Sequence, residues 1–179
     1  AQMQYNLIGY GNNDFFVRGN LKFSFYTFRQ RNEPISLIVS AGTNLREPDF
    51  YEQNLYTNHF KWNNNFSKIS TTNIGGALEI PKWWLKVKVD YALLKNNLYF
   101  DSKGIIQQNA QPMSVLSAAL EENLVLWKFH LDNRILLQFS SNQNVVPLPV
   151  LALNLRYYIQ FTVVKNAMDM QIGANMTYN

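Results

Sequence analysis

Trp83-Trp84-Leu85-Lys86-Val87-Lys88-Val89-Asp90-Tyr91-Ala92-Leu93-Leu94 is the stretch that decides the fold. Apolar and aromatic residues occupy its odd positions, and charged residues occupy its even positions from Lys86 to Asp90. A β-strand directs successive side chains to opposite faces, so this period of two predicts a strand with one apolar and one charged face. A soluble sheet and a membrane barrel both contain such strands.

The same alternation recurs along most of the chain. Further strands are expected over residues 3–10, 14–28, 35–45, 54–80, 113–120, 123–140, 150–165 and 168–178, with a turn over 29–34. Residues 54–80 and 123–140 are each interpreted as one strand because their parity is unbroken, although a hairpin at Asn63–Asn65 stays open. We therefore expect an all-β fold, an antiparallel up-and-down meander of about nine long strands in a single domain over 1–179.

Short turns are expected at Pro81-Lys82, Glu121-Glu122 and Asn166-Ala167. Residues that flank a two-residue turn pair with each other and point to the same face, and at all these turns both flanking residues have the apolar parity. Proline does not suit a two-residue turn. A four-residue loop from Ile80 to Trp83 is expected there, with pairing from Glu79 and Trp84 onward.

Short and long connections alternate, with long polar loops over 95–112 and 141–149. Transmembrane barrels have short turns at one end and longer loops at the other. Their aromatic residues gather near strand ends, at the two membrane interfaces. The expected membrane-interface aromatics are Trp83, Tyr91, Trp127, Tyr157 and Tyr178. The pattern favours a membrane barrel, but a soluble sandwich or a small lipid-binding barrel stays open.

Composition narrows the function classes. Charged residues make up only 16% of the chain, the net charge is +4, and no cysteine is present. Without a block of Lys or Arg we expect no nucleic-acid partner. The only histidines are His59 and His130, and the paired carboxylates Glu121-Glu122 are expected in a solvated turn. We therefore expect no enzyme, no cofactor and no metal site.

The polar parity marks the side chains that would face a lumen if the strands form a barrel. These candidates are Arg18, Lys22, Lys86, Lys88, Asp90, Lys128, His130, Asp132, Arg134, Arg156 and Asp169. Positive groups exceed negative ones, which would bias a pore towards anionic solutes. The alternative is that these charges pair across strands and only stabilise a plugged wall.

Four segments carry a resemblance to a known family: Tyr56–Phe66, Lys128–Arg134, Leu155–Tyr158 and Gln171–Asn179. They are similar to segments of the putative porin family of Bacteroidota. The resemblance implies an outer-membrane β-barrel in the cell outer membrane, with outer-membrane lipid and small solutes as partners. Members of that family are longer, and bacterial single-chain barrels have even strand numbers. We therefore expect an incomplete portion of a larger barrel, completed by further segments of the same chain or by other outer-membrane proteins.

Two functions remain open on the sequence, and a third is weaker. The first is a porin that allows passive diffusion of small solutes through a polar lumen. The second is a structural barrel subunit of an outer-membrane assembly with a blocked lumen. The third is a soluble lipid- or glycan-binding β-barrel. The loop over 95–112 would fold into the lumen in a constricted pore or outward as a docking site.

Overall fold

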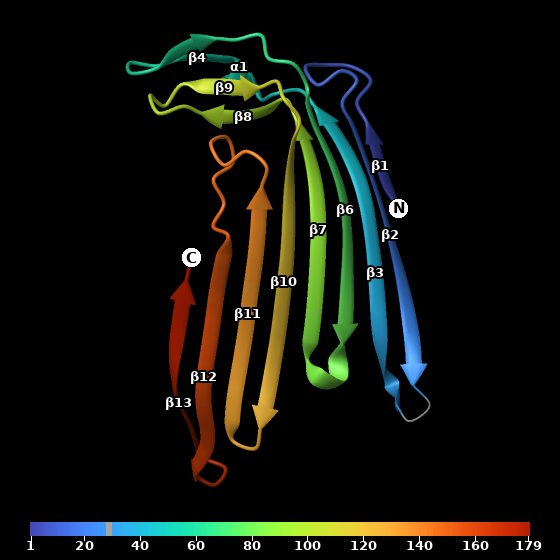
Figure 1. Ribbon diagram of the computed structural model, residues 1–179, viewed down its shortest axis with the longest axis vertical. Coiled ribbons are helices and arrows are strands. Elements are labelled where there is room, and N and C mark those ends of the chain that lie inside the picture. Colours follow the sequence, from blue (N-terminus) through green and yellow to red (C-terminus); the bar gives the residue numbers. More distant parts are fainter. Residues whose placement is uncertain (28–29) are drawn as a thin grey trace.

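The computed structural model describes residues 1–27 and 30–179. Nine strands form one antiparallel sheet, and their order across the sheet is their order along the chain (Figure 1). They are β1 (Gln2–Tyr5), β2 (Phe15–Thr27), β3 (Gln30–Arg46), β6 (Ile69–Ile80), β7 (Leu85–Lys95), β10 (Met113–Leu126), β11 (Phe129–Ser140), β12 (Leu151–Val164) and β13 (Met168–Tyr178). The expected all-β meander is confirmed. The sheet is open, with β1 and β13 at its two edges.

Two small hairpins stand at one end of the sheet, at the top of Figure 1. The short helix α1 (Phe50–Gln53) leads into β4 (Asn54–Tyr56), which pairs with β5 (Lys61–Asn63). The second hairpin pairs β8 (Asn97–Phe100) with β9 (Ile106–Asn109). The tight turns lie at the opposite end of the sheet. Long and short connections therefore alternate as expected.

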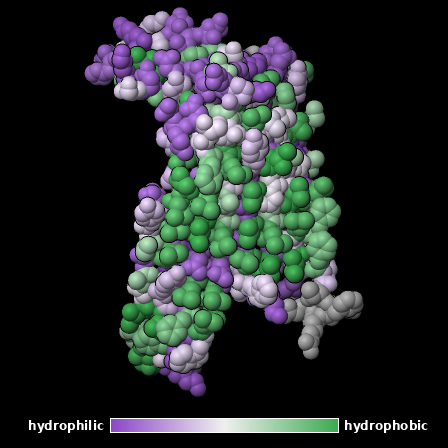
Figure 2. Space-filling model, viewed as in Figure 1, coloured by the Kyte–Doolittle hydropathy of each residue, from purple (hydrophilic) through white to green (hydrophobic). Residues whose placement is uncertain are grey.

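The register gives the sheet one apolar and one polar face. Leu37, Leu78 and Val87 lie opposite one another on the apolar face, and Lys88 lies opposite Ala77 on the polar face. Hydrophobic side chains cover the middle of the apolar face, and hydrophilic ones cover the end that carries the two hairpins (Figure 2). Leu21, Ile74 and Ile172 are 63%, 59% and 59% exposed. No second layer covers this face in the part of the chain that the structure describes.

The most deeply buried apolar side chains lie mainly at the hairpin end. Ile69, Ile106 and Met113 are 5%, 3% and 2% exposed, and Pro48, in the chain leading to α1, is also fully buried. Away from this end the sheet has few buried side chains, such as Ser36 and Ala77. Among the described residues no helix is long and apolar enough to span a bilayer. The hydrophobic core thus fixes the hairpins to the strand ends and leaves the apolar face of the sheet free.

The single strand expected over 54–80 is wrong. The chain turns between Thr57 and Phe60, where the Thr57 hydroxyl donates to the Phe60 carbonyl and accepts from its N–H, both at 3.0 Å. The turn does not lie at the Asn triplet either, because Asn63 ends β5 and the Asn64 N–H donates to the Gln53 carbonyl at 2.7 Å. Alternation persisted through the segment although the chain leaves the sheet there.

The turn expected at Glu121-Glu122 is also wrong, and so is the single strand over 123–140. β10 continues to Leu126, and the chain turns at Trp127-Lys128, with Trp127 in the left-handed region at φ 58°. Glu121 stays in the strand because Lys86 and Arg134 lie opposite it on the neighbouring strands. The error reverses the faces of residues 123–126.

Three other boundaries differ from expectation. The loop expected over 95–112 contains the β8–β9 hairpin. A 3-10 turn, η1 (Pro81–Trp83), precedes a left-handed Trp84, so Glu79 pairs with Lys86 and not with Trp84. At the last hairpin Val164 pairs with Met168 after a register shift. The strand expected over 14–28 ends, and the turn expected over 29–34 begins, at residues 28 and 29, which lie outside the described residues. The rest of that expected turn, residues 30–34, belongs to β3.

Candidate functional site on the polar face of the sheet

The register brings nearly all the polar candidates to one face. The paired rows place Arg18, Lys22, Lys86, Lys88, Asp90, His130, Asp132, Arg134, Arg156 and Asp169 on the polar face. Lys128 is the exception, because it lies in the β10–β11 turn with its ammonium 4.8 Å from the Trp127 ring centre. This face is the candidate functional site.

A row of alternating charges crosses the polar face close to the β6–β7 turn. Glu79, Lys86, Glu121 and Arg134 lie opposite one another on β6, β7, β10 and β11. The Lys86 ammonium is 3.0 Å from the Glu79 carboxylate, and the Lys22 ammonium is 3.8 Å from it. Neighbours of opposite charge on facing strands stabilise each other. Sequence reasoning missed Glu121, since it placed this residue in a turn.

Other charges on this face are also paired. Arg156 donates from Nε and Nη2 to Asp132 Oδ2, at 2.9 and 2.6 Å. The Lys88 ammonium is 2.8 Å from Asp90. Glu121 lies on the polar face and Lys128 does not, so the excess of positive over negative side chains on this face is smaller than the sequence indicated. Pairing across strands, the alternative that the sequence left open, therefore accounts for Lys22, Lys86 and Arg156, whereas Lys88 pairs with Asp90 on its own strand.

The expected interface aromatics divide into two groups. Tyr91, Tyr157 and Tyr178 lie on the apolar face. Trp83 and Trp127 lie in the tight turns and are 60% and 80% exposed. The turn tryptophans are at the end of the sheet opposite the hairpins, as Figure 1 places these turns.

A short polar line crosses the apolar face. Asn133 donates to the Glu122 carboxylate at 3.3 Å, and the Tyr157 hydroxyl donates to Asn133 at 2.9 Å. Glu122 is opposite Leu85, which places its carboxylate on the apolar side of β10. Hydrogen bonding lowers the cost of placing these polar groups there.

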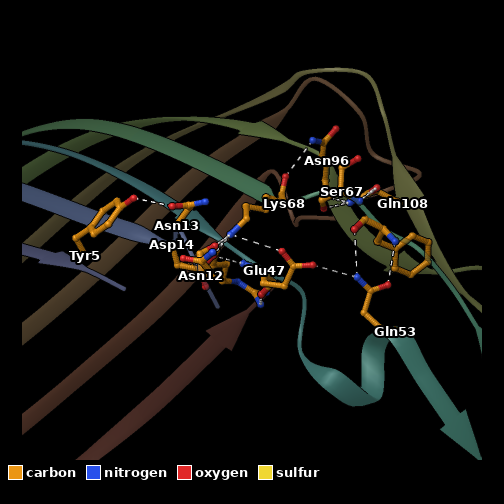
Figure 3. Close-up of polar contacts among 12 residues, drawn as sticks. Tyr5, Asn12, Asn13, Asp14, Glu47, Gln53, Ser67, Lys68, Asn96 and Gln108 are labelled. Carbon is orange, nitrogen blue, oxygen red and sulfur yellow. Dashed lines mark hydrogen bonds and ion pairs between the residues drawn. The ribbon is translucent and has the colours of Figure 1, made fainter. Parts of the chain in front are cut away.

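Lys68 joins three loops at the hairpin end (Figure 3). Its ammonium lies 2.6 Å from Asp14 Oδ1 and 3.6 Å from Glu47 Oε2, and it also donates to the Asn12 carbonyl. The hydrogen bond to Asp14 raises the pKa of Lys68 above its ordinary value, against a smaller opposing effect of desolvation. Lys68 thereby connects the β1–β2 loop to the segments after β3 and before β6.

Two glutamines hold the segment before β6 from opposite sides (Figure 3). Gln53, which is 6% exposed, donates to the Phe66 carbonyl at 3.1 Å and accepts from the Phe66 N–H at 2.9 Å. Gln108 makes the same pair of bonds with Ser67 and also donates to the Asn96 carbonyl at 3.0 Å. No sequence signal indicated these contacts, because they join residues far apart in the chain.

The described residues contain no group of three or more His, Asp or Glu side chains that could hold a metal ion. No buried side-chain polar atom among them lacks a hydrogen-bond partner. The polar face therefore combines ion pairs with exposed amides and cations. Such a face can border water and make transient contacts with dissolved molecules.

Comparison with known proteins agrees with the architecture. A family model described as "Putative porin" matches residues 1–179, the whole of this sequence. No curated protein and no solved structure gave a significant match. An antiparallel meander with one apolar face, short turns at one end and long connections at the other is the arrangement found in membrane barrels. The chain belongs to the putative porin family.

Proposed function

We propose that this chain forms part of the wall of an outer-membrane porin, whose polar lumen allows passive diffusion of small solutes. The observation that carries the proposal is the contrast between the two faces of one sheet. Ile74 and Ile172 are 59% exposed on the apolar face, whereas the charges on the opposite face are largely paired. In this arrangement outer-membrane lipid covers the apolar face.

The physical chemistry of the bilayer supports this assignment. Soluble proteins rarely expose an apolar patch larger than a few hundred Å². A sheet satisfies the backbone groups between its strands internally, as a lipid environment requires. The unpaired edges of β1 and β13 would be costly in lipid, so the barrel needs further strands from the same protein or from other outer-membrane proteins.

The position of the β8–β9 hairpin favours a porin with an open lumen over a subunit with a blocked lumen. The β8–β9 hairpin is attached through Gln108 to Ser67 and Asn96, beyond the end of β6 and β7. These contacts hold the hairpin at the mouth of the sheet and away from the polar row at Lys86. Long loops at one mouth are typical of the extracellular side of outer-membrane barrels.

Reconstitution of the complete protein in planar lipid bilayers tests the proposal. We expect stepwise increases in conductance, and we expect the folded protein to require detergent for solubility. Folded protein that inserts into the bilayer without conducting would favour the structural subunit with a blocked lumen. A protein that stays folded and soluble without detergent would contradict both membrane functions.

A further inference from the structure

A hollow on the polar face lies near the tight turns, away from the hairpin end. Its volume is about 510 Å³. Asn123, Asp132, Arg156 and Asn175 lie opposite one another on β10, β11, β12 and β13 and form one row of its lining. The neighbouring row contains His130, Tyr158 and Gly173, and Trp84 reaches the hollow from the β6–β7 turn.

The Tyr158 ring contacts His130 and Arg156, whose Cζ is 5.5 Å from the ring centre, and is open on the side of β13. Its ring stacks on His130 with centres 4.6 Å apart and planes 5° from parallel. On the β13 side the opposite residue is Gly173, where a Cβ atom would lie 2.4 Å from Tyr158 Cβ. No side chain can therefore stand beside the ring there, and Tyr158 and Gly173 together line a second hollow.

The Arg156–Asp132 ion pair and the Asn123 and Asn175 amides surround the ring, and the exposed Arg134 guanidinium also lines the hollow. Arg156 Nε and Nη2 both donate to Asp132 Oδ2, which leaves Asp132 Oδ1 as an acceptor and Arg156 Nη1 as a donor. The Asn123 and Asn175 side chains make no hydrogen bond with the described residues. Each amide offers donors and an acceptor.

We propose that this hollow binds a neutral saccharide, with one sugar ring stacked against Tyr158. The assignment rests on the proposed function, because it identifies the class of solute that the polar face recognises. The C–H face of a sugar ring is complementary to the negative face of an aromatic ring. Adjacent hydroxyls both donate and accept, which matches the Arg156–Asp132 pair and the amides. The Arg156–Asp132 pair carries no net charge, and the remaining charge of the lining is that of Arg134, which the anionic probe tests.

The test uses the complete protein in planar bilayers, with maltohexaose as the neutral probe and citrate as the anionic probe. Maltohexaose is expected to interrupt the ion current in a concentration-dependent way. Tyr158→Ala should weaken the apparent affinity about tenfold, whereas Tyr158→Phe, which keeps the ring, should bind within about threefold of the unchanged protein. Tyr157→Ala is the matched control, since Tyr157 is the adjacent tyrosine on the opposite face.

The outcomes separate this inference from the proposed function. A conducting protein that maltohexaose does not interrupt, or that only citrate interrupts, overturns the saccharide site and leaves the porin assignment intact. If no conductance is found, titration calorimetry with maltohexaose in detergent decides the inference by itself. Binding that Tyr158→Ala weakens and Tyr158→Phe retains supports the site, and absence of binding overturns it. An equal loss in Tyr157→Ala also overturns it.

Discussion

Gln108 binds Ser67 in the way that a neighbouring strand would, donating to its carbonyl at 2.7 Å and accepting from its N–H at 3.0 Å. These residues are 41 positions apart in the chain. The bond pair fastens the β8–β9 hairpin to the segment that enters β6. Side chains thus supply at the hairpin end the connections that backbone pairing supplies within the sheet.

Gln108→Ala should loosen this attachment. The change removes three hydrogen bonds, and partly exposed hydrogen bonds of this kind contribute about 1 kcal/mol or less each. We expect a local loss of about 1–2 kcal/mol, which accelerates amide hydrogen exchange at residues 66–68 roughly 5–30-fold. Gln111→Ala is the control. Unchanged exchange at these residues would show that the hairpin is held by its apolar contacts alone.

Lys68→Met should release the β1–β2 loop from the segments after β3 and before β6. We expect several-fold faster proteolysis within residues 6–14, measured in proteoliposomes. Lys61→Met is the matched control, because Lys61 makes no ion pair with the described residues. Equal cleavage in both variants would contradict the role assigned to Lys68.

The same contact predicts a response to alkaline pH. A pKa that folding raises means that the stabilisation is complete below the ordinary value of 10.5 and is lost as the pH rises through the raised value. Proteolysis of residues 6–14 should therefore increase only above about pH 10.5 in the unchanged protein. Lys68→Met should lack this step, and a step that persists in the variant would assign it to another group.

Asp101 should stabilise the β8–β9 turn at neutral pH. Its carboxylate accepts from the Ile105 and Lys103 N–H groups at 3.0 and 2.9 Å, and these bonds lower its pKa, with the bond from Ile105 contributing most. The stabilisation is present above the ordinary value of 3.8 and is lost as the pH falls through the lowered value. Asp101→Ala should accelerate exchange at Ile105 at pH 7, and Asp101→Asn, which keeps an acceptor oxygen, should have a smaller effect.

The alternation of side chains determined the two faces of the sheet but not the position of every turn. The apolar parity is even at Leu120 and odd at Phe129, so the chain must turn between them. Leu124 to Trp127 is apolar at every position and fits either parity. The Glu121-Glu122 pair suggested a solvated turn, but the cations opposite Glu121 belong to strands whose register the local sequence does not reveal.

The contacts at the hairpin end could not be predicted from the sequence, because they too depend on partners outside the local segment. Its stability depends on Lys68, Gln53 and Gln108, and each of these reaches partners that are distant in the chain. Polar residues in loops do not alternate in a regular period, so the sequence does not predict such contacts. The residues of the polar face share one period that the sequence shows, whereas Asn123 was assigned to the apolar face and Lys128 to the polar face because the turn was misplaced.

The adjacent residues Glu121 and Glu122 give a direct test of both the register and the proposed lumen. Glu121 lies on the polar face between Lys86 and Arg134, and Glu122 lies on the apolar face opposite Leu85. Glu121→Gln removes a negative charge from the wall of the path. A unit charge about 8 Å from a permeating ion in water contributes about 0.5 kcal/mol, with opposite signs for chloride and potassium, so the chloride-to-potassium permeability ratio should rise roughly fivefold.

Glu122→Gln removes the same charge one residue away and should leave the permeability ratio unchanged. Reversal potentials in a potassium chloride gradient measure both variants in the same bilayers. A shift in Glu122→Gln with none in Glu121→Gln would reverse the faces of β10. Permeability ratios that stay at the value of the unchanged protein in both variants, with normal conductance, would mean that ions do not pass along this face. A charge on the wall of a conducting path must act on the ions beside it.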